Sequence, residues 1–76
     1  MRVKLFTGPD CTLCDQAKTL IYPFMANGLE LEEIDVRQSL DTKRDYGLRI
    51  PMLVKPDGAE LGWPFDEEQL RAFLAS

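Results

Sequence analysis

Histidine is missing from this sequence, and cysteine occurs only twice among its 76 residues. A structural zinc site needs four ligands, which are usually cysteine or histidine side chains. One chain therefore has too few of these residues to close such a site by itself. A metal site shared between two chains stays open, with Cys11 and Cys14 contributed by each chain.

Basic residues are also scarce in this chain. Nine Lys and Arg stand against thirteen Asp and Glu, which gives a net charge of −4. A surface of this sign gives phosphate backbones and anionic lipids no general attraction. We therefore expect neither nucleic acid nor a membrane among the partners.

Long hydrophobic runs are absent as well. The run Met1–Phe6 alternates apolar with basic residues and stops at Gly8-Pro9, well short of the apolar region of a signal peptide. We expect a cytoplasmic protein without a leader. Cysteines in that reducing compartment are rarely structural, and a bridge across two residues closes a loop too small to stabilise much. Cys11 and Cys14 therefore need a chemical explanation.

The remaining composition is that of a folded domain. Hydrophobic residues make up 45% of the chain and charged residues 29%, whereas disordered segments have less apolar content and more net charge. A chain of 76 residues leaves room for one core, so we expect a single monomeric domain over residues 1–76. A domain this short buries only roughly 60% of its unfolded surface, which predicts low stability.

Hydrophobic periodicity predicts the element order β-α-β-α-β-β-α. Strands are expected at 2–7, 29–36, 48–55 and 59–61, and helices at 11–24, at 39–46 and from 66 onward. The first strand is apolar on both faces, which predicts a central position in the sheet. The second strand starts near Leu31 or carries a bulge. The first βαβ unit should be parallel, and Pro56-Asp57-Gly58 should turn the last two strands into a hairpin.

The first helix has an apolar stripe at helical spacing. Its members are Leu13, Ala17, Leu20, Ile21 and Phe24. Asp10 or Thr12 is expected to cap its start, and Pro23 to kink the helix or end it early. The last helix is expected to begin with a capping box in which Asp66 is the cap and Gln69 lies three residues on.

Cys11 and Cys14 lie where the first strand ends and the first helix begins. The amino end of a helix stabilises negative charge through its free N–H groups and its dipole, and thiolate is the nucleophilic form of cysteine. Cys11 is therefore the better attacking thiol, and Cys14, one turn inside on the same face, is the better resolving thiol. Asp10 and Asp15 oppose a thiolate there, whereas Lys18 favours it.

Three other interpretations of the pair stay open. The cysteines can be inert, since buried free cysteine is common. The chain can be a binding module without turnover that recognises a partner through Ile50, Trp63 and the 8–14 loop. A metal-bridged dimer through both cysteine pairs is the third. Redox chemistry is favoured because the pair lies in a βαβ pattern.

Two segments carry a family resemblance. Leu5–Cys14, with its Cys-Thr-Leu-Cys motif after a strand, and Tyr46–Val54, with its Ile-Pro dipeptide, resemble the thioredoxin superfamily and, within it, small glutaredoxin-like proteins. The element order matches over essentially the whole chain. The resemblance implies the thioredoxin fold, an α/β fold with a four-stranded mixed sheet and helices on both faces. It also implies a thiol–disulfide oxidoreductase with a role in cell redox homeostasis.

The resemblance assigns roles to individual residues. Cys11 matches the nucleophile, Cys14 the resolving cysteine, and Pro51 the cis-proline that faces the redox pair. The backbone of Ile50 is then free to pair with a bound peptide or with glutathione. Asp66 matches an aspartate that in glutaredoxins helps to hold the amino group of glutathione.

Other positions depart from the family pattern. Thr12-Leu13 stands between the cysteines where glutaredoxins usually have Pro-Tyr, and no Lys stands just before Cys11, where glutaredoxins often have one. The double glycine after the last strand is represented by Gly62-Trp63.

Two residues have alternative readings, and one more is a further candidate. Trp63 is an aromatic platform for substrate or a plug over the core, and Asp66 is a glutathione ligand or a plain helix cap. Arg49 lies next to the Ile50-Pro51 dipeptide and is a further candidate for the site. The expected partner is a protein disulfide or a glutathione mixed disulfide. We expect no bound cofactor and no metal, with glutathione acting only as reductant or substrate.

Overall fold

The elements of the structure follow the predicted order with one addition. The computed structural model describes all 76 residues. Its strands are β1 (Arg2–Thr7), β2 (Glu30–Asp35), β3 (Met52–Val54) and β4 (Glu60–Gly62), and its α-helices are α1 (Thr12–Met25), α2 (Leu40–Tyr46) and α3 (Glu67–Ala75). A short 3-10 helix, η1 (Val36–Gln38), separates β2 from α2.

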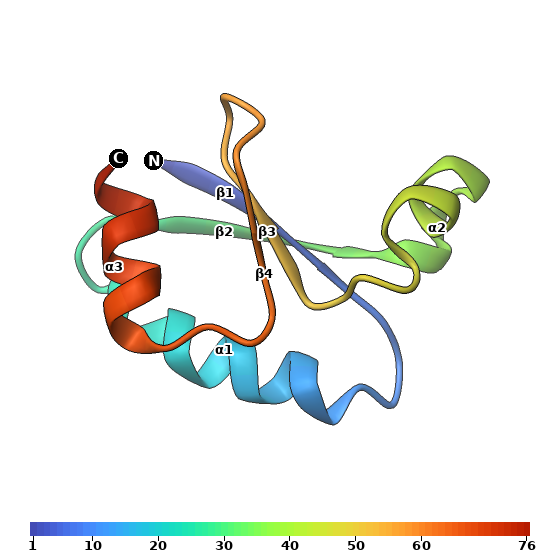
Figure 1. The fold of residues 1–76 in the computed structure, drawn as a ribbon, viewed down its shortest axis with the longest axis horizontal. Coiled ribbons are helices and arrows are strands. Elements are labelled where there is room, and N and C mark those ends of the chain that lie inside the picture. The colour runs from blue at the N-terminus through green and yellow to red at the C-terminus, as the bar shows by residue number, and fades with distance from the viewer.

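β1 is a central strand, as its two-sided apolarity predicts. The sheet has the order β2-β1-β3-β4, and β1 pairs in parallel with β2 and antiparallel with β3. β4 is the antiparallel hairpin partner of β3. Parallel neighbours need a long crossover connection. Helix α1 is that connection, and it runs back in the direction opposite to β1 (Figure 1).

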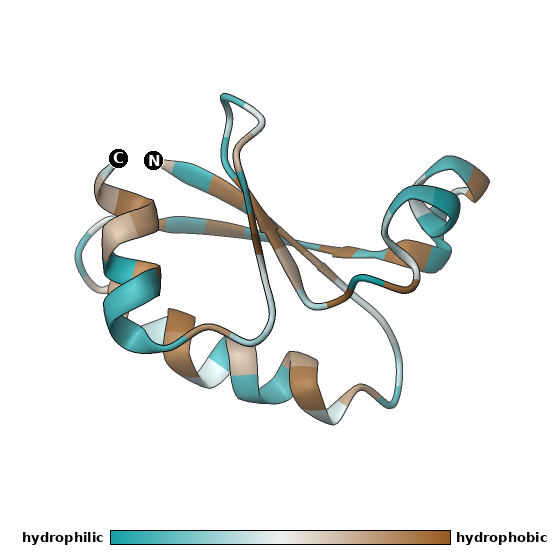
Figure 2. Ribbon diagram, in the orientation of Figure 1, coloured by the Kyte–Doolittle hydropathy of each residue, from teal (hydrophilic) through white to brown (hydrophobic).

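Helices lie on both faces of the sheet. The main core lies between one face of the sheet and the helices α1 and α3, and its buried members are Val3, Leu5, Ala17, Ile21, Leu53, Phe65 and Leu70. On the other face, Tyr46 of α2 stacks on Phe6 of β1, with ring centroids 4.0 Å apart. Apolar residues accordingly follow β1 and β3, while much of α2 is polar (Figure 2).

Helix α1 begins differently from the prediction. Cys11 itself is the N-cap, with extended backbone at φ −108° and ψ 95°, and its Sγ accepts a hydrogen bond from the N–H of Cys14. The predicted caps are wrong because Asp10 adopts φ 51° in the turn before the helix and Thr12 is already helical. Within the first turn, Cys14 is buried and Leu13 is 47% exposed, so Leu13 does not belong to the apolar stripe.

Helix α1 also continues past Pro23 and ends at Met25. A proline this close to the end of a helix interrupts a single backbone hydrogen bond, which the last turn tolerates. Gly28 follows at φ 97°, a left-handed conformation that glycine adopts without steric cost, and the chain turns there into β2. None of the helices combines the length and apolarity that crossing a bilayer requires.

The strand predicted at 48–55 is shorter in the structure. β3 covers only Met52–Val54, and the chain before it forms a turn. Pro51 has no N–H to offer to a neighbouring strand, and the Ile50–Pro51 peptide bond is cis. The N–H of Arg49 closes the turn by donating to the Tyr46 carbonyl at 2.8 Å. Apolar alternation alone could not distinguish this turn from strand.

The remaining boundaries lie within one residue of the predictions. β2 starts at Glu30 and stops at Asp35, because the Asp35 side chain accepts the N–H of Arg37 at 2.8 Å and thereby begins η1. Helix α3 has the predicted capping box. Asp66 Oδ1 accepts the Gln69 N–H at 2.7 Å, and Gln69 Oε1 accepts the Asp66 N–H at 2.9 Å.

Lys55, just after β3, is a buried lysine. The residue is only 5% exposed. Its Nζ donates to the Phe73 carbonyl at 2.8 Å, and to the carbonyl and Oγ of Ser76 at 3.0 and 2.7 Å. A cation at the carboxyl end of a helix also interacts favourably with the helix dipole. Lys55 thereby joins the sheet to the end of α3.

Replacing Lys55 by methionine keeps the apolar stem and removes the ammonium group. We expect Lys55→Met to lower the free energy of unfolding by about 1–3 kcal/mol, because the carbonyls at the end of α3 lose a charged donor. Lys43→Met, at an exposed lysine of α2, is the matched control and should change that free energy by less than about 0.5 kcal/mol. Urea denaturation followed by circular dichroism measures both variants. Equal effects of the two substitutions would contradict the role assigned to Lys55.

Candidate active site

Cys11 and Cys14 meet at the amino end of α1. Cys11 is the N-cap and Cys14 lies in the first turn, so the two side chains lie on the same side of the helix. The sulfurs are joined in a disulfide, and the Cα atoms are 5.2 Å apart, within the usual range for such a bond. The pair follows directly after the loop that leaves the carboxyl end of β1.

The two sulfurs differ in their access to solvent. Cys14 is 1% exposed, whereas Cys11 is partly exposed. The N–H of Cys14 donates to Cys11 Sγ at 3.1 Å, and it is one of the N–H groups that the start of a helix leaves free. The same donor can stabilise a thiolate on Cys11 once the disulfide is reduced. The site therefore contains one partly exposed cysteine and one shielded cysteine.

Arg37 is a cation near this loop that the sequence did not single out. Its guanidinium holds the Asp35 carboxylate, with Nη2 2.8 Å from Oδ2 and Nε 3.2 Å from Oδ1, and this hydrogen bonding lowers the pKa of Asp35. The same pairing raises the pKa of Arg37, and the charge of Asp10 adds to that rise. Asp10 directly precedes Cys11, so Arg37 offsets part of the negative charge expected to oppose a thiolate there. The only signal in the sequence was the Asp-x-Arg spacing at the end of a strand.

Lys18, which we expected to favour the thiolate, pairs with a strand instead. Its Nζ lies 2.9 Å from Glu33 Oε1 on β2. The hydrogen bond that Lys18 donates to the Glu33 carboxylate raises the pKa of Lys18. The ammonium group is therefore matched by a carboxylate on the sheet, and its effect on the cysteines is reduced.

Ile50 packs on the loop before Cys11, whereas Pro51 contacts Trp63. A β-carbon added at Gly8 would lie 3.0 Å from Ile50 Cδ1, so the Ile50 side chain packs directly on the backbone of the loop that leads to Cys11. Pro51 is buried, and its carbonyl accepts the N–H of Trp63 at 3.2 Å. The structure thus links Ile50 to the loop before Cys11 and Pro51 to Trp63.

Trp63 and Asp66 both have structural partners. The Trp63 ring is partly buried against the main core and meets Phe65 edge to face, with centroids 5.0 Å apart. The Asp66 carboxylate caps α3 through the Gln69 N–H. Neither residue is fully buried. A role of Trp63 or Asp66 in binding substrate therefore stays a prediction.

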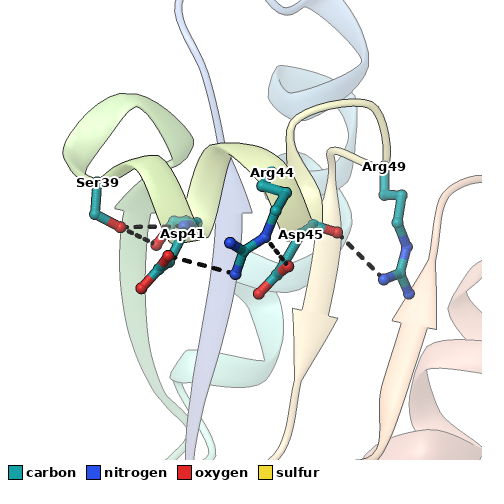
Figure 3. A network of polar contacts seen from close by, with 6 residues as sticks. Ser39, Asp41, Arg44, Asp45 and Arg49 are labelled. Atoms are coloured by element: carbon teal, nitrogen blue, oxygen red, sulfur yellow. Dashed lines mark hydrogen bonds and ion pairs between the residues drawn. The ribbon is translucent and has the colours of Figure 1, made fainter.

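Arg49 belongs to a separate polar group. It forms an ion pair with Glu60, and its guanidinium lies 5.3 Å from the centre of the Tyr46 ring. Its Nη1 donates to the Asp45 carbonyl at 3.4 Å (Figure 3). Burial and the hydrogen bond to Glu60 raise the pKa of Tyr46. None of the polar contacts of Arg49 reaches the cysteines or the other predicted site residues.

The largest cavity does not lie at the cysteine pair. It has a volume of about 550 Å³ and is lined by Arg2, Lys4, Glu32 and Val54, among others. Arg2 and Lys4 belong to the amino-terminal half of β1, whereas the cysteines follow its carboxyl end. No group of three or more Cys, Asp or Glu side chains in the structure is placed to hold a metal ion.

Known proteins similar to this chain include glutaredoxin-like sequences. Residues 2–75 match the family model described as Glutaredoxin-like domain (DUF836). A glutaredoxin-like protein of Dictyostelium discoideum is 42% identical over 41 residues, which cover 47% of this chain and 38% of that protein. The match therefore spans well under two thirds of the length of that relative.

Solved structures with the same arrangement of elements also exist. The X-ray structure of the structural-genomics protein XcR50 from X. campestris is 37% identical with a TM-score of 0.84, and the match covers 96% of this chain and 95% of that one. A malarial protein is 17% identical with a TM-score of 0.70, over 97% and 92% of the two chains. The first two thioredoxin domains of Saccharomyces cerevisiae Eps1p are 20% identical with a TM-score of 0.53, over 95% of this chain and 33% of that one. The last two likenesses concern the fold alone, and together these structures confirm the expected fold class.

The difference in exposure predicts a difference in reactivity between the two thiols. In the reduced protein, Cys11 should react with iodoacetamide at least about tenfold faster than Cys14, because the reagent reaches its sulfur and the helix end favours its thiolate. A short pulse of reagent followed by fragment-ion mass spectrometry assigns the label to one residue. Unfolding in urea is the control and should bring the two rates together. Faster labelling of Cys14 in the folded protein would contradict the asymmetry.

Proposed function

Because this chain belongs to the glutaredoxin-like family of the thioredoxin superfamily, we propose that it is a thiol–disulfide oxidoreductase that works through Cys11 and Cys14. The observation that supports this most directly is a cysteine pair at disulfide distance on the amino end of a helix. A pair in this position combines a stabilised thiolate with a second thiol close enough to release the mixed disulfide that the thiolate forms.

The reaction consists of two exchanges at sulfur. The Cys11 thiolate attacks one sulfur of a substrate disulfide, a new S–S bond joins Cys11 to that sulfur, and the other substrate sulfur leaves as a thiolate that takes up a proton. Cys14, as a thiolate, then attacks Cys11 Sγ. The Cys11–Cys14 bond forms and the second substrate sulfur leaves in the same way. Two electrons pass to the substrate, and two thiols of a reductant such as glutathione return them by forming their own disulfide.

Burial and helix position suit the two cysteines to different steps. The partly exposed Cys11 can meet a substrate disulfide, and the Cys14 N–H already points at its sulfur. Cys14 is shielded from outside disulfides, but it lies one helical turn from Cys11. Its attack is therefore intramolecular, and a high effective concentration favours release of the mixed disulfide.

The surroundings of the pair favour an extended peptide as the substrate. Ile50 lies beside the loop before Cys11, and its N–H and carbonyl are absent from the backbone hydrogen bonds of the chain. Free backbone groups of this kind can pair with a peptide in the manner of a strand. We therefore propose a protein disulfide as substrate. A glutathione mixed disulfide is the second choice, because the Asp66 carboxylate already caps α3.

A binding module without turnover is the second candidate function. Two exposed leucines favour it: Leu13, between the cysteines, is 47% exposed, and Leu48, just before the Ile50–Pro51 bond, is fully exposed. Apolar side chains in such positions suit the docking of a partner as well as a passing substrate. Turnover measurements separate the two functions.

Serine variants of the two cysteines test the proposed reaction. With a disulfide-bonded protein as substrate and glutathione as reductant, Cys11→Ser should reduce it only at the background rate, because the attacking sulfur is gone. Without glutathione, which could release the mixed disulfide in place of Cys14, Cys14→Ser should still attack the substrate and should accumulate the mixed disulfide, since the intramolecular group that releases it is missing. Turnover assays and mass spectrometry of the acid-quenched protein measure both outcomes. Wild-type activity in Cys11→Ser, or no activity in the unmodified protein, would refute the proposal, and the second result would favour the binding module.

A further inference from the structure

Thr7 carries a buried hydroxyl that has no hydrogen-bond partner. The residue is 8% exposed, and its Oγ1 is the one buried side-chain polar atom of the chain without a partner. Buried polar groups in proteins are nearly always paired, and an unpaired one costs free energy that a valine of the same shape would avoid. A state of the protein in which this hydroxyl has a partner would explain the threonine.

Thr7 is the last residue of β1 and shares the face of that strand that packs on α1. Alternate residues of a strand point to the same face. Val3 and Leu5, four and two residues earlier, lie in the main core together with Ala17 and Ile21 of α1. The Thr7 side chain therefore points to the same side of the sheet, two residues beyond Leu5 and next to the loop that leads to Cys11.

The buried face of α1 packs against this face of β1. Its buried residues are Cys14, Ala17 and Ile21. α1 runs back along β1 in the opposite direction, so that its amino end lies over the carboxyl end of the strand (Figure 1). Cys14 continues the buried face of α1 one turn before Ala17, just as Thr7 continues the face of β1 after Leu5. Extending both faces by one step would put the Thr7 hydroxyl opposite the first turn of the helix, on the side where Cys14 is buried.

The neighbouring strand does not supply a partner for this hydroxyl. Asp35 of β2 is the residue in register with Thr7. Its carboxylate is held by the Arg37 guanidinium and backbone N–H. On the helix side, the buried residue of the first turn is Cys14. Its sulfur becomes a stronger hydrogen-bond acceptor when the disulfide is reduced.

We propose that Thr7 is a positioning residue for the resolving thiol: its hydroxyl hydrogen-bonds to the Cys14 sulfur in the dithiol state and has no partner in the disulfide state. The inference rests on the proposed redox function. Reduction breaks the Cys11–Cys14 bond and adds two electrons and two protons, supplied by two thiols of a reductant that become a disulfide. Cys14 is then a thiol or a thiolate, and a thiolate is a much stronger acceptor than a disulfide sulfur.

A contact made in one redox state shifts the equilibrium toward that state. The Thr7 hydroxyl therefore favours the dithiol over the disulfide. In the second exchange it also stabilises the Cys14 thiolate and holds that sulfur in place for attack on Cys11. The hydroxyl donates a hydrogen bond and transfers no proton, so the stoichiometry of the reaction is unchanged.

Isosteric variants of the whole chain test this role. Thr7→Val removes the hydroxyl and keeps the shape, Thr7→Ser keeps the hydroxyl, and Thr7→Ala is a second variant without it. Thr19→Val is the matched control, because Thr19 is exposed on α1 and its hydroxyl bonds only to the Asp15 carbonyl. Each variant is equilibrated in glutathione buffers of graded ratio, quenched with acid, and analysed by mass spectrometry for the dithiol and disulfide forms. Urea unfolding of each form gives its stability separately.

The expected result is a shift of the equilibrium constant toward the disulfide by about threefold to tenfold in Thr7→Val, the size of one hydrogen bond. Thr7→Ala should shift it in the same direction, while Thr7→Ser and Thr19→Val should stay within about twofold of the unmodified protein, below that one-bond effect. Thr7→Val should also stabilise the disulfide form against urea relative to the dithiol form. A residue with a merely structural role would change both forms equally.

Two different failures can be distinguished. If the unmodified protein forms the disulfide and Thr7→Val leaves the equilibrium unchanged, the role of Thr7 is wrong and the proposed function stands. If no Cys11–Cys14 disulfide forms at any glutathione ratio, the proposed function fails and the role of Thr7 fails with it.

Discussion

The hydrogen bond from the Cys14 N–H to the Cys11 sulfur is the interaction on which the chemistry of this protein depends. It exists because Cys11 is extended and Thr12 is helical, so the first free donors of α1 point back at the cap. β1, hydrogen-bonded on both sides, fixes the place from which the loop to Cys11 starts. A donor fixed in advance where negative charge develops needs no rearrangement during the reaction.

The rest of the molecule serves to hold this junction with few buried groups. Only 14 of 76 residues are buried. A domain this small therefore gains little stability from core packing alone. Polar interactions outside the core add to its stability: Lys55 hydrogen-bonds to the end of α3, and Arg49, in the turn before Pro51, pairs with Glu60 on β4. Arg49 is adjacent to Ile50 in the chain. Its ion pair therefore supports the position of Ile50 beside the loop that leads to Cys11.

Features encoded by neighbouring residues could be predicted from the sequence. The capping box of Asp66 and Gln69 needs only residues three apart, and the central place of β1 follows from its own two-sided apolarity. The N-cap of α1 was predicted incorrectly, because oxygen side chains are the common caps and a cysteine sulfur is not among them. Leu13, which the apolar spacing placed on the buried face, is exposed in the structure, and Cys14 is buried instead.

Features that depend on contacts between distant residues were not visible in the sequence. The turn at 48–51 has the same apolar alternation as a strand, and only the missing pairing partners show the difference. The pairing of Lys18 with Glu33, and the place of Arg37 near Asp10, require the parallel register of β1 and β2 and the return of α1. The unpaired hydroxyl of Thr7 is likewise defined only by what surrounds it in the fold.

The most direct test of the account is the ultraviolet absorbance of the Cys11 thiolate as a function of pH. Cys14→Ser leaves a single thiol and keeps the backbone N–H that points at it, and the same variant unfolded in urea is the reference. The account predicts that the thiolate of the folded protein appears at lower pH than that of the unfolded protein, because the helix end and its N–H stabilise the charge. A thiolate that appears at the same or higher pH in the folded protein would contradict it.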